Sequence, residues 1–350
     1  MTGVEKITVG IRADGNGTIG MGHLMRCMSI AYGLQEQGME CEFYTAGQEA
    51  GKVLTEKGFS CRVLHTDYRD MESELPVLKQ MLEEDGCRLL LVDSYQMTQK
   101  YLDELMEQCP VFYMDDMGTG RLTADGIINY NIYGRELGYE AWCPAGTMLL
   151  LGAEYAPVKK AFIKTTYHVR DRVSRIMITM GGSDTLNIAG QLGERLLRML
   201  PEETELNIIC GRFNPHLDTL KEMAGLEERL HILVDVQDMW NKMAAADIAV
   251  SAAGSTMYEL SAMGVPTVCC YYVENQRRIA EGFGVKVQMV NAGDFSADDE
   301  AVLDRLCEEV CRLAKDTDAR KALSRRMKQV ADGWGAERIA RELQQRILQN

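Results

Sequence analysis

The residues with the clearest chemical meaning stand near the start of the chain. A strand-like run over residues 7–11 leads into a loop, residues 14–22, that contains four glycines, and His23 stands where a helix is expected to begin. Helix N-termini present unpaired N–H groups and the positive end of the helix dipole, which favour an anionic ligand and keep an imidazole neutral. The pattern therefore predicts a general base, His23, beside glycine backbone that a substrate can approach closely.

Charged residues around this histidine offer two further functions. A protonated His23 needs a nearby carboxylate, and the sequence leaves the choice open among Asp14, Asp93, Asp115 and Asp116. Arg26 lies three residues after His23 on the same helical face, where it either binds a phosphate or pairs with an acid of its own domain. In this part of the chain the residues expected to contact the substrate are Arg12, Asp14, Gly20, Gly22 and Arg26.

The glycine loop also fits a dinucleotide fingerprint, because Gly15, Gly17 and Gly20 satisfy GxGxxG after a strand. That fold needs an acid at the end of the second strand to hold a ribose, and residues 44–46 read Tyr-Thr-Ala there. A nicotinamide or flavin site is therefore not expected. The five histidines are far apart and the eleven cysteines show no zinc-type spacing, so the sequence predicts reduced thiols, no cofactor and no metal.

A second constellation is the segment MGGSDTLN, residues 180–187, on a predicted strand-to-helix turn. Gly181 and Gly182 free the backbone, and Ser183 supplies a hydroxyl. The segment is expected to contact a phosphate or a sugar; the alternative is an ordinary helix cap after a turn.

A third constellation opens the next predicted helix of this half. Gly254, Ser255 and Thr256 follow a buried strand, and their N–H and hydroxyl groups can hold a diphosphate. Glu259 lies one turn further on, where its carboxylate can accept two hydrogen bonds from a ribose diol. The alternative for Glu259 is a capping box with Thr256.

Two amides, Asn275 and Gln276, begin a further helix after the strand that follows. Amide side chains suit neutral hydroxyl and acetamido groups of a sugar. Helix capping is the alternative function for both.

Strand-like and helix-like segments that alternate along the chain must position these groups. Continuous apolar runs that end in acids, residues 89–93 and 111–116, are typical of buried parallel strands. The pattern predicts two doubly wound, Rossmann-like α/β domains with a cleft between them. The predicted boundaries are an N-terminal domain over 1–155, a linker over 156–172, a C-terminal domain over 173–292 and a helical tail over 293–350.

Composition limits the cellular context of the protein. The chain has 350 residues, a hydrophobic share of 46% and a formal net charge of −14. The acidic balance argues against nucleic acid or an anionic membrane as partner. No apolar run is long enough for a membrane span and no signal peptide is evident, so a cytoplasmic protein is expected.

Together the motifs resemble the UDP-2,4-diacetamido-2,4,6-trideoxy-β-L-altropyranose hydrolases of pseudaminic acid biosynthesis, in the GT-B superfamily. The resemblance runs from Ile7 to about Asn291, and the remaining tail matches weakly. The motifs that carry it are IRADGNGTIGMGHLMR (11–26), VDSY (92–95), DD (115–116), LLGAEYAPVKKAF (150–162), MGGSD (180–184), SAAGSTMYEL (251–260) and ENQ (274–276).

This resemblance implies a GT-B fold and metal-independent hydrolysis of a UDP-sugar with inversion at the anomeric carbon. His23 matches the family's general base, and Tyr95 and Asn275 match residues around the sugar. UDP is expected on residues 181–184 and 254–259, with water as the second substrate and a monomer as the working form. Ser183 replaces the threonine of some members, which preserves the hydroxyl, and the variable neighbours of Tyr95 affect sugar selectivity.

Three alternatives remain at this stage. The same fold supports a glycosyltransferase that moves the sugar of a UDP-sugar donor to an acceptor. A non-catalytic nucleotide-sugar sensor would need no base, which His23 argues against. A hydrolase of a related diacetamido nucleotide sugar, or one of spore-coat polysaccharide formation, would share all the motifs.

Overall fold

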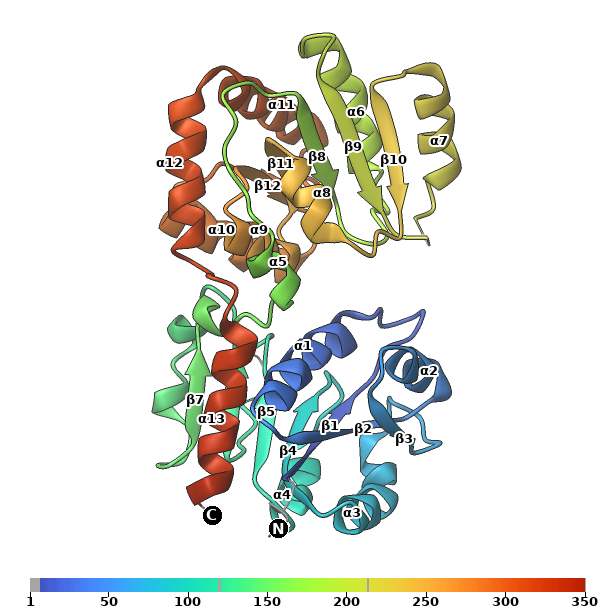
Figure 1. Cartoon of the computed structure of the whole chain (residues 1–350), viewed down its shortest axis with the longest axis vertical. Coiled ribbons are helices and arrows are strands. Elements are labelled where there is room, and N and C mark those ends of the chain that lie inside the picture. Colours follow the sequence, from blue (N-terminus) through green and yellow to red (C-terminus); the bar gives the residue numbers. More distant parts are fainter. Residues whose placement is uncertain (1–6, 119–120, 213, 350) are drawn as a thin grey trace. The chain divides into compact units, whose positions relative to one another are not determined.

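The computed structural model describes residues 7–118, 121–212 and 214–349, and the chain consists of two compact units. The first unit comprises Met1–Lys159 together with Trp334–Asn350, and the second comprises Lys160–Gly333. Residues 1–6 and 350, at the outer ends of the predicted domain and tail, lie outside the described residues. The segment 293–350, expected as one tail, is divided, because its last helix belongs to the first unit (Figure 1).

The first unit is built on a seven-stranded parallel sheet in the order β3-β2-β1-β4-β5-β6-β7. Its strands are β1 (Thr8–Ala13), β2 (Glu40–Thr45), β3 (Ser60–Val63), β4 (Cys87–Asp93), β5 (Val111–Met114), β6 (Gly126–Asn129) and β7 (Met148–Leu151). Its helices are α1 (Gly22–Glu36), α2 (Gln48–Glu56), α3 (Leu75–Glu84), α4 (Gln99–Met106) and α13 (Gly335–Gln349). Short 3-10 helices are η1 (Met71–Glu74), η2 (Gly134–Leu137), η3 (Tyr139–Ala141) and η4 (Ala153–Tyr155).

The second unit repeats the plan with a six-stranded parallel sheet in the order β10-β9-β8-β11-β12-β13. Its strands are β8 (Arg175–Thr179), β9 (Glu205–Cys210), β10 (Leu230–Val234), β11 (Ile248–Ala252), β12 (Thr267–Tyr271) and β13 (Asn291–Asp294). Its helices are α5 (Lys160–Lys164), α6 (Ile188–Met199), α7 (Leu217–Leu226), α8 (Met239–Ala245), α9 (Thr256–Met263), α10 (Glu274–Val287), α11 (Asp299–Lys315) and α12 (Thr317–Lys328). The doubly wound α/β class predicted from the sequence is confirmed in both units.

Apolar strands bury the centre of each sheet. Residues 89–92 of β4 and 248–250 of β11 are fully buried, as continuous apolar runs in a parallel sheet covered on both faces should be. Helix α13 closes the first unit by packing on α1, where the position that a Cβ of Gly33 would occupy is 3.1 Å from the Ala336 carbonyl oxygen. This close helix crossing explains why the end of the chain returns to the first unit.

The topology decides where polar groups gather. In a parallel sheet the carboxyl ends of all strands meet at one edge, and ligands bind where the strand order reverses. The order reverses beside β1 in the first unit and beside β8 in the second. The glycine loop after β1 and the GGSD turn after β8 therefore occupy equivalent positions in the two units.

Candidate functional site

His23 is fixed by a carboxylate from a neighbouring strand. The residue is the second of α1, and its Nδ1 lies 2.6 Å from Oδ1 of Asp93, the last residue of β4. Strand pairing sets this contact, since Ala13 at the end of β1 is in register with Asp93. Donation of the Nδ1 proton to Asp93 leaves Nε2 as the nitrogen that can accept a proton. Of the four acids that the sequence left open, the structure selects Asp93.

Arg26 pairs with acids of its own unit, which resolves its two predicted functions at the level of geometry. Its Nε and Nη2 each donate to a different Asp93 oxygen at 2.5 Å, and its Nη1 donates to Asp116 Oδ2 at 2.5 Å. The Tyr130 ring lies under the guanidinium, 5.6 Å from centroid to Cζ, and its hydroxyl also bonds Arg26. The side chain is nine-tenths buried. These contacts occupy the guanidinium within the first unit.

Asp93 remains ionised in spite of its burial. Only 1% of the residue is exposed, and burial by itself would raise the pKa of its carboxyl. Arg26 and then His23 oppose this effect through charge and hydrogen bonds, and the pKa of Asp93 lies below its ordinary value as a result. The carboxylate can thus orient the imidazole and stabilise its protonated form at neutral pH.

Tyr95 presents the exposed part of this network. Its ring stands edge-on to the His23 ring, with centroids 4.5 Å apart, and 55% of the residue is exposed. Its hydroxyl donates to Asp116 Oδ2 at 3.0 Å, and the environment of that hydroxyl raises the pKa of Tyr95. A neutral phenol anchored in this way offers an aromatic surface directly beside the base.

The predicted substrate contact of Arg12 is wrong, and Asp14 is not available either. Arg12 is fully buried and donates to both oxygens of Glu74, at 2.6 and 2.8 Å, and to Asp14 at 2.5 Å. The second Asp14 oxygen accepts the Ala46 N–H at 2.8 Å. The physical reason is that Arg12 lies within β1, one residue before its end, and its side chain enters the protein interior. Both residues support the loop from below.

The glycine loop itself folds on a side-chain turn. Asn16 Oδ1 accepts the N–H groups of Thr18 and Ile19, and its backbone exchanges two hydrogen bonds with Gly20. Gly20 has φ +74°, a left-handed conformation that favours glycine. Gly22 is different: its φ is not positive and a Cβ there would meet nothing within 4 Å. Neither packing nor backbone strain within this unit requires glycine at 22.

The GGSD turn of the second unit combines a cap with an exposed backbone. Asp184 is buried and accepts the N–H groups of Ile188 and Ala189 at the start of α6, so the capping alternative applies to this residue. Burial raises the pKa of Asp184, partly offset by those two bonds. Gly181, Gly182 and Ser183 are exposed beside it. The exposed backbone of the turn is left for a ligand.

Sequence reasoning missed the loop that supports this turn. Gly211, just after β9, donates its N–H to the Gly182 carbonyl at 3.2 Å, and a Cβ on Gly211 would lie 2.6 Å from that oxygen. The next residue, Arg212, forms an exposed ion pair with Asp235 after β10. A glycine directly after an apolar strand was the available signal.

The start of α9 presents N–H groups at the same sheet edge. Ser255 precedes the first helical residue, Thr256, and its side chain makes no capping bond. Since Thr256 is already helical, it does not hold the cap position that a capping box with Glu259 requires. Gly254 has no positive φ, and a Cβ there would meet nothing within 4 Å, as at Gly22. Glycine at 254 is therefore unexplained by the unit's own packing.

The two predicted amides differ in their surroundings. Gln276 lies in the first turn of α10, and its Oε1 accepts the Tyr272 N–H at 3.2 Å. Tyr272 in turn donates its hydroxyl to the Met180 carbonyl before the GGSD turn. Asn275 is exposed on the same turn. Gln276 therefore ties α10 to the strand ends, and Asn275 remains a candidate for substrate contact.

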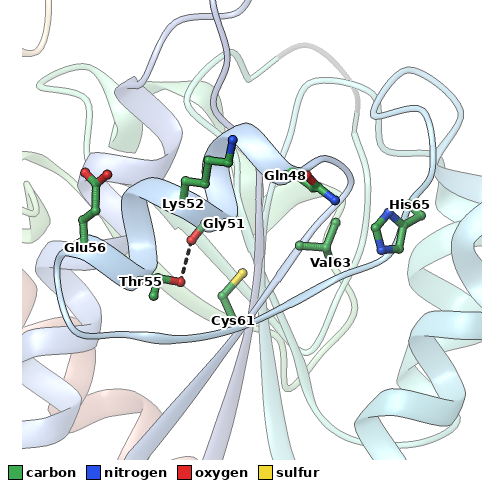
Figure 2. Close-up of a pocket in the computed structure, with 8 residues that line it drawn as sticks. All are labelled: Gln48, Gly51, Lys52, Thr55, Glu56, Cys61, Val63 and His65. Atoms are coloured by element: carbon green, nitrogen blue, oxygen red, sulfur yellow. Dashed lines mark hydrogen bonds between the residues drawn. The ribbon is translucent and has the colours of Figure 1, made fainter.

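A separate cavity of about 470 Å³ lies between α2 and β3 in the first unit (Figure 2). Its lining includes Lys52, Cys61 and His65, and none of the residues bonded to His23. Among the described residues no group of three or more His, Cys, Asp or Glu side chains is placed to share a metal ion. None of the described helices is long and apolar enough to cross a membrane.

Comparisons with known proteins place this arrangement among relatives. No family model matches the chain. The chain is 24% identical to the spore coat polysaccharide biosynthesis protein SpsG of Bacillus subtilis over 344 residues, 96% of this chain and 97% of SpsG. It is 23% identical to the UDP-2,4-diacetamido-2,4,6-trideoxy-β-L-altropyranose hydrolase of Campylobacter jejuni over 271 residues, 77% of this chain and 93% of that protein. An uncharacterized protein of Methanocaldococcus jannaschii is 24% identical, and the match spans 58% of its length.

A solved structure identifies the fold. MurG of Acinetobacter baumannii matches with a TM-score of 0.69 over 97% of this chain and 99% of its own, at 13% identity. The predicted GT-B fold is therefore confirmed, and so is the resemblance to the hydrolase, through the relative that carries that name.

Proposed function

We propose that this protein is a UDP-sugar hydrolase that cleaves UDP-2,4-diacetamido-2,4,6-trideoxy-β-L-altropyranose, or a closely related diacetamido nucleotide sugar, as in pseudaminic acid biosynthesis. Water attacks the anomeric carbon, the bond from that carbon to the UDP oxygen breaks, and His23 Nε2 takes the proton of the water. The products are UDP and the free sugar with inverted anomeric configuration. No metal takes part.

The observation that carries this proposal is the His23–Asp93 pair. A histidine whose Nδ1 is held by an ionised carboxylate at 2.6 Å has its other nitrogen prepared to accept a proton. The helix N-terminus keeps the imidazole neutral before reaction, and Asp93 stabilises the imidazolium after it. Tyr95, half-exposed beside the ring, is the surface on which we place the sugar.

Glycines without an internal reason support the nucleotide assignment. Gly22, Gly182 and Gly254 all have open space where a Cβ would lie and no positive φ. Glycine costs conformational entropy, so a position that does not need it for folding points to close approach by a ligand. UDP is assigned to the second unit, on 181–183 and 254–256, with Glu259 accepting the ribose hydroxyls. Asn275 and Gln276 are assigned to the sugar and its acetamido groups.

Relatives in two classes bear on the reaction type. The hydrolase name of one relative favours water as acceptor, whereas a relative in Sorangium cellulosum, 27% identical over 53% of this chain, is named as an N-acetylglucosamine transferase. A transferase with the same base is therefore the second candidate. It would need an acceptor before the sugar leaves UDP.

One experiment tests the proposal. Incubation of the protein with a panel of UDP- and CMP-sugars, followed by NMR of the anomeric protons, should show UDP and the inverted free sugar without any acceptor and in the presence of EDTA. His23→Asn should bind UDP normally and turn over at least 100-fold more slowly. Turnover that needs an acceptor would favour the transferase, and unchanged turnover of His23→Asn would contradict the base.

A further inference from the structure

The charges around His23 do not consist of a simple acid–histidine pair. Arg26 binds Asp93 through two nitrogens, so one full positive charge lies directly on the carboxylate that should stabilise the imidazolium. Its Nη2 is also only 3.0 Å from His23 Nδ1. Taken alone, Arg26 would neutralise Asp93 and disfavour a second positive charge on His23.

Asp116 changes this balance. It follows β5, and its Oδ2 accepts Arg26 Nη1 at 2.5 Å. With Asp93 and Asp116 negative and Arg26 positive, the network carries one net negative charge when His23 is neutral and none when His23 is protonated. A proton on His23 therefore completes the charge balance of a largely buried cluster.

The other groups that face the cluster are neutral. They are the hydroxyls of Tyr95 and Tyr130 and the thiol of Cys27, which lies 3.5 Å from Asp93 Oδ2. Burial raises the pKa of all three groups, so they stay protonated. Asp116 Oδ1 is buried without a hydrogen-bond partner among the described residues, which leaves its charge incompletely compensated by donors.

We propose that Asp116 and Arg26 are positioning residues that set the proton affinity of His23 in opposite directions. Asp116 offsets Arg26, so that the negative charge of Asp93 remains available to the imidazolium, and Arg26 prevents His23 from being protonated before the substrate arrives. The rate consequence of this inference rests on the proposed function, whereas the charge balance itself does not.

NMR titration of the His23 ring tests the charge balance without any substrate. Asp116→Asn should lower the titration midpoint of His23 by roughly one pH unit, and Arg26→Gln should raise it by a similar amount. The double variant should titrate near the wild-type midpoint. The resonance is assigned by its loss in His23→Asn, and His231 of the second unit serves as an internal reference that should not shift.

Conservative variants separate charge from structure. Asp116→Glu and Arg26→Lys keep the charges, so both should titrate near the wild type even if their geometry is imperfect. Equal shifts in these variants, shifts of one sign in Asp116→Asn and Arg26→Gln, or no shift in folded protein would each overturn the proposal.

The pH profile of turnover provides the second readout. The rate should rise with pH as His23 loses its proton, and this limb of kcat/KM should move to lower pH in Asp116→Asn and to higher pH in Arg26→Gln. A limb that stays fixed while the NMR midpoint moves would contradict the role in the reaction. If the titrations move as expected and the wild type hydrolyses no nucleotide sugar, the proposed function fails and the charge balance stands.

Discussion

The two sheets use the same local device, a helix that begins at the carboxyl edge beside a switch in strand order, and they equip it differently. At the start of α1 the first unit places a histidine, an arginine and two aspartates that bind one another. At the start of α9 the second unit places glycine, serine and threonine, with backbone N–H groups and no bound charge from its own cap residue. The helix end is the same; its side chains decide whether it tunes a base or receives an anion.

The difference has a physical cause. A proton acceptor must be held in one tautomer and one orientation, and only side-chain bonds with fixed partners do that. A diphosphate is recognised well by backbone N–H groups, which need no ionisable partner and cost no desolvation of a charge. Substitutions in the first unit should therefore change rate, and substitutions in the second should change affinity.

Asp93→Asn should produce the largest effect. It removes the charge that orients and stabilises His23, and kcat should fall by about 10³-fold or more while KM changes little. Steady-state kinetics of the variant, with its folding checked by circular dichroism, measures this. Asp115→Asn is the matched control, because Asp115 lies at the same edge but accepts from Tyr139 and the Gly118 N–H. A loss below tenfold for Asp93→Asn would remove the base from its central place.

Arg12→Met tests whether the buried network under the loop is structural. It leaves Glu74 fully buried and without its bidentate partner, so the free energy of unfolding should fall by roughly 3–5 kcal/mol. Urea denaturation measures this change. Turnover per folded molecule should stay close to the wild type, whereas a selective loss of UDP affinity in the folded variant would restore Arg12 to the site.

The sequence predicted the site's side chains better than their partners. His23 and the four candidate acids were recognisable from their types and from the ends of apolar runs. The choice of Asp93 depends on the register of β1 with β4, a contact between residues 70 positions apart that no local pattern contains. Arg12 was misjudged because its bond to Glu74, 62 residues away, was equally invisible.

Short strands mark the other limit. The strands β6 and β7 each have four residues, GIIN and MLLL, within a stretch that reads as irregular. The sheet accepts them because their neighbours supply the pairing and the burial, which local propensity cannot show. The return of α13 to the first unit depends in the same way on packing against Gly33, a tertiary contact.

Gly254→Ala sharpens the comparison from the side of affinity. No packing or φ of the unit opposes a methyl group there, so stability should be unchanged or rise by about 0.4–1 kcal/mol. If a phosphate approaches this backbone, the Kd for UDP should rise at least tenfold, as calorimetry would show. Gly225→Ala in α7 is the control, because a Cβ there also meets nothing within 4 Å, and it should alter stability alone. Equal affinity in both variants would move UDP away from α9.

Glu259→Gln should have the smallest effect and separates ribose recognition from helix capping. An amide keeps one acceptor oxygen but loses the charge that strengthens bonds from the ribose hydroxyls, so UDP should bind roughly three- to tenfold more weakly. The same substitution should hardly change the affinity for 2′-deoxy-UDP, because one of the two hydroxyls is already missing. Calorimetry with both nucleotides on both proteins completes a double cycle. A capping role would instead lower the unfolding temperature and weaken both nucleotides equally, and α9 would then bind its ligand through backbone alone.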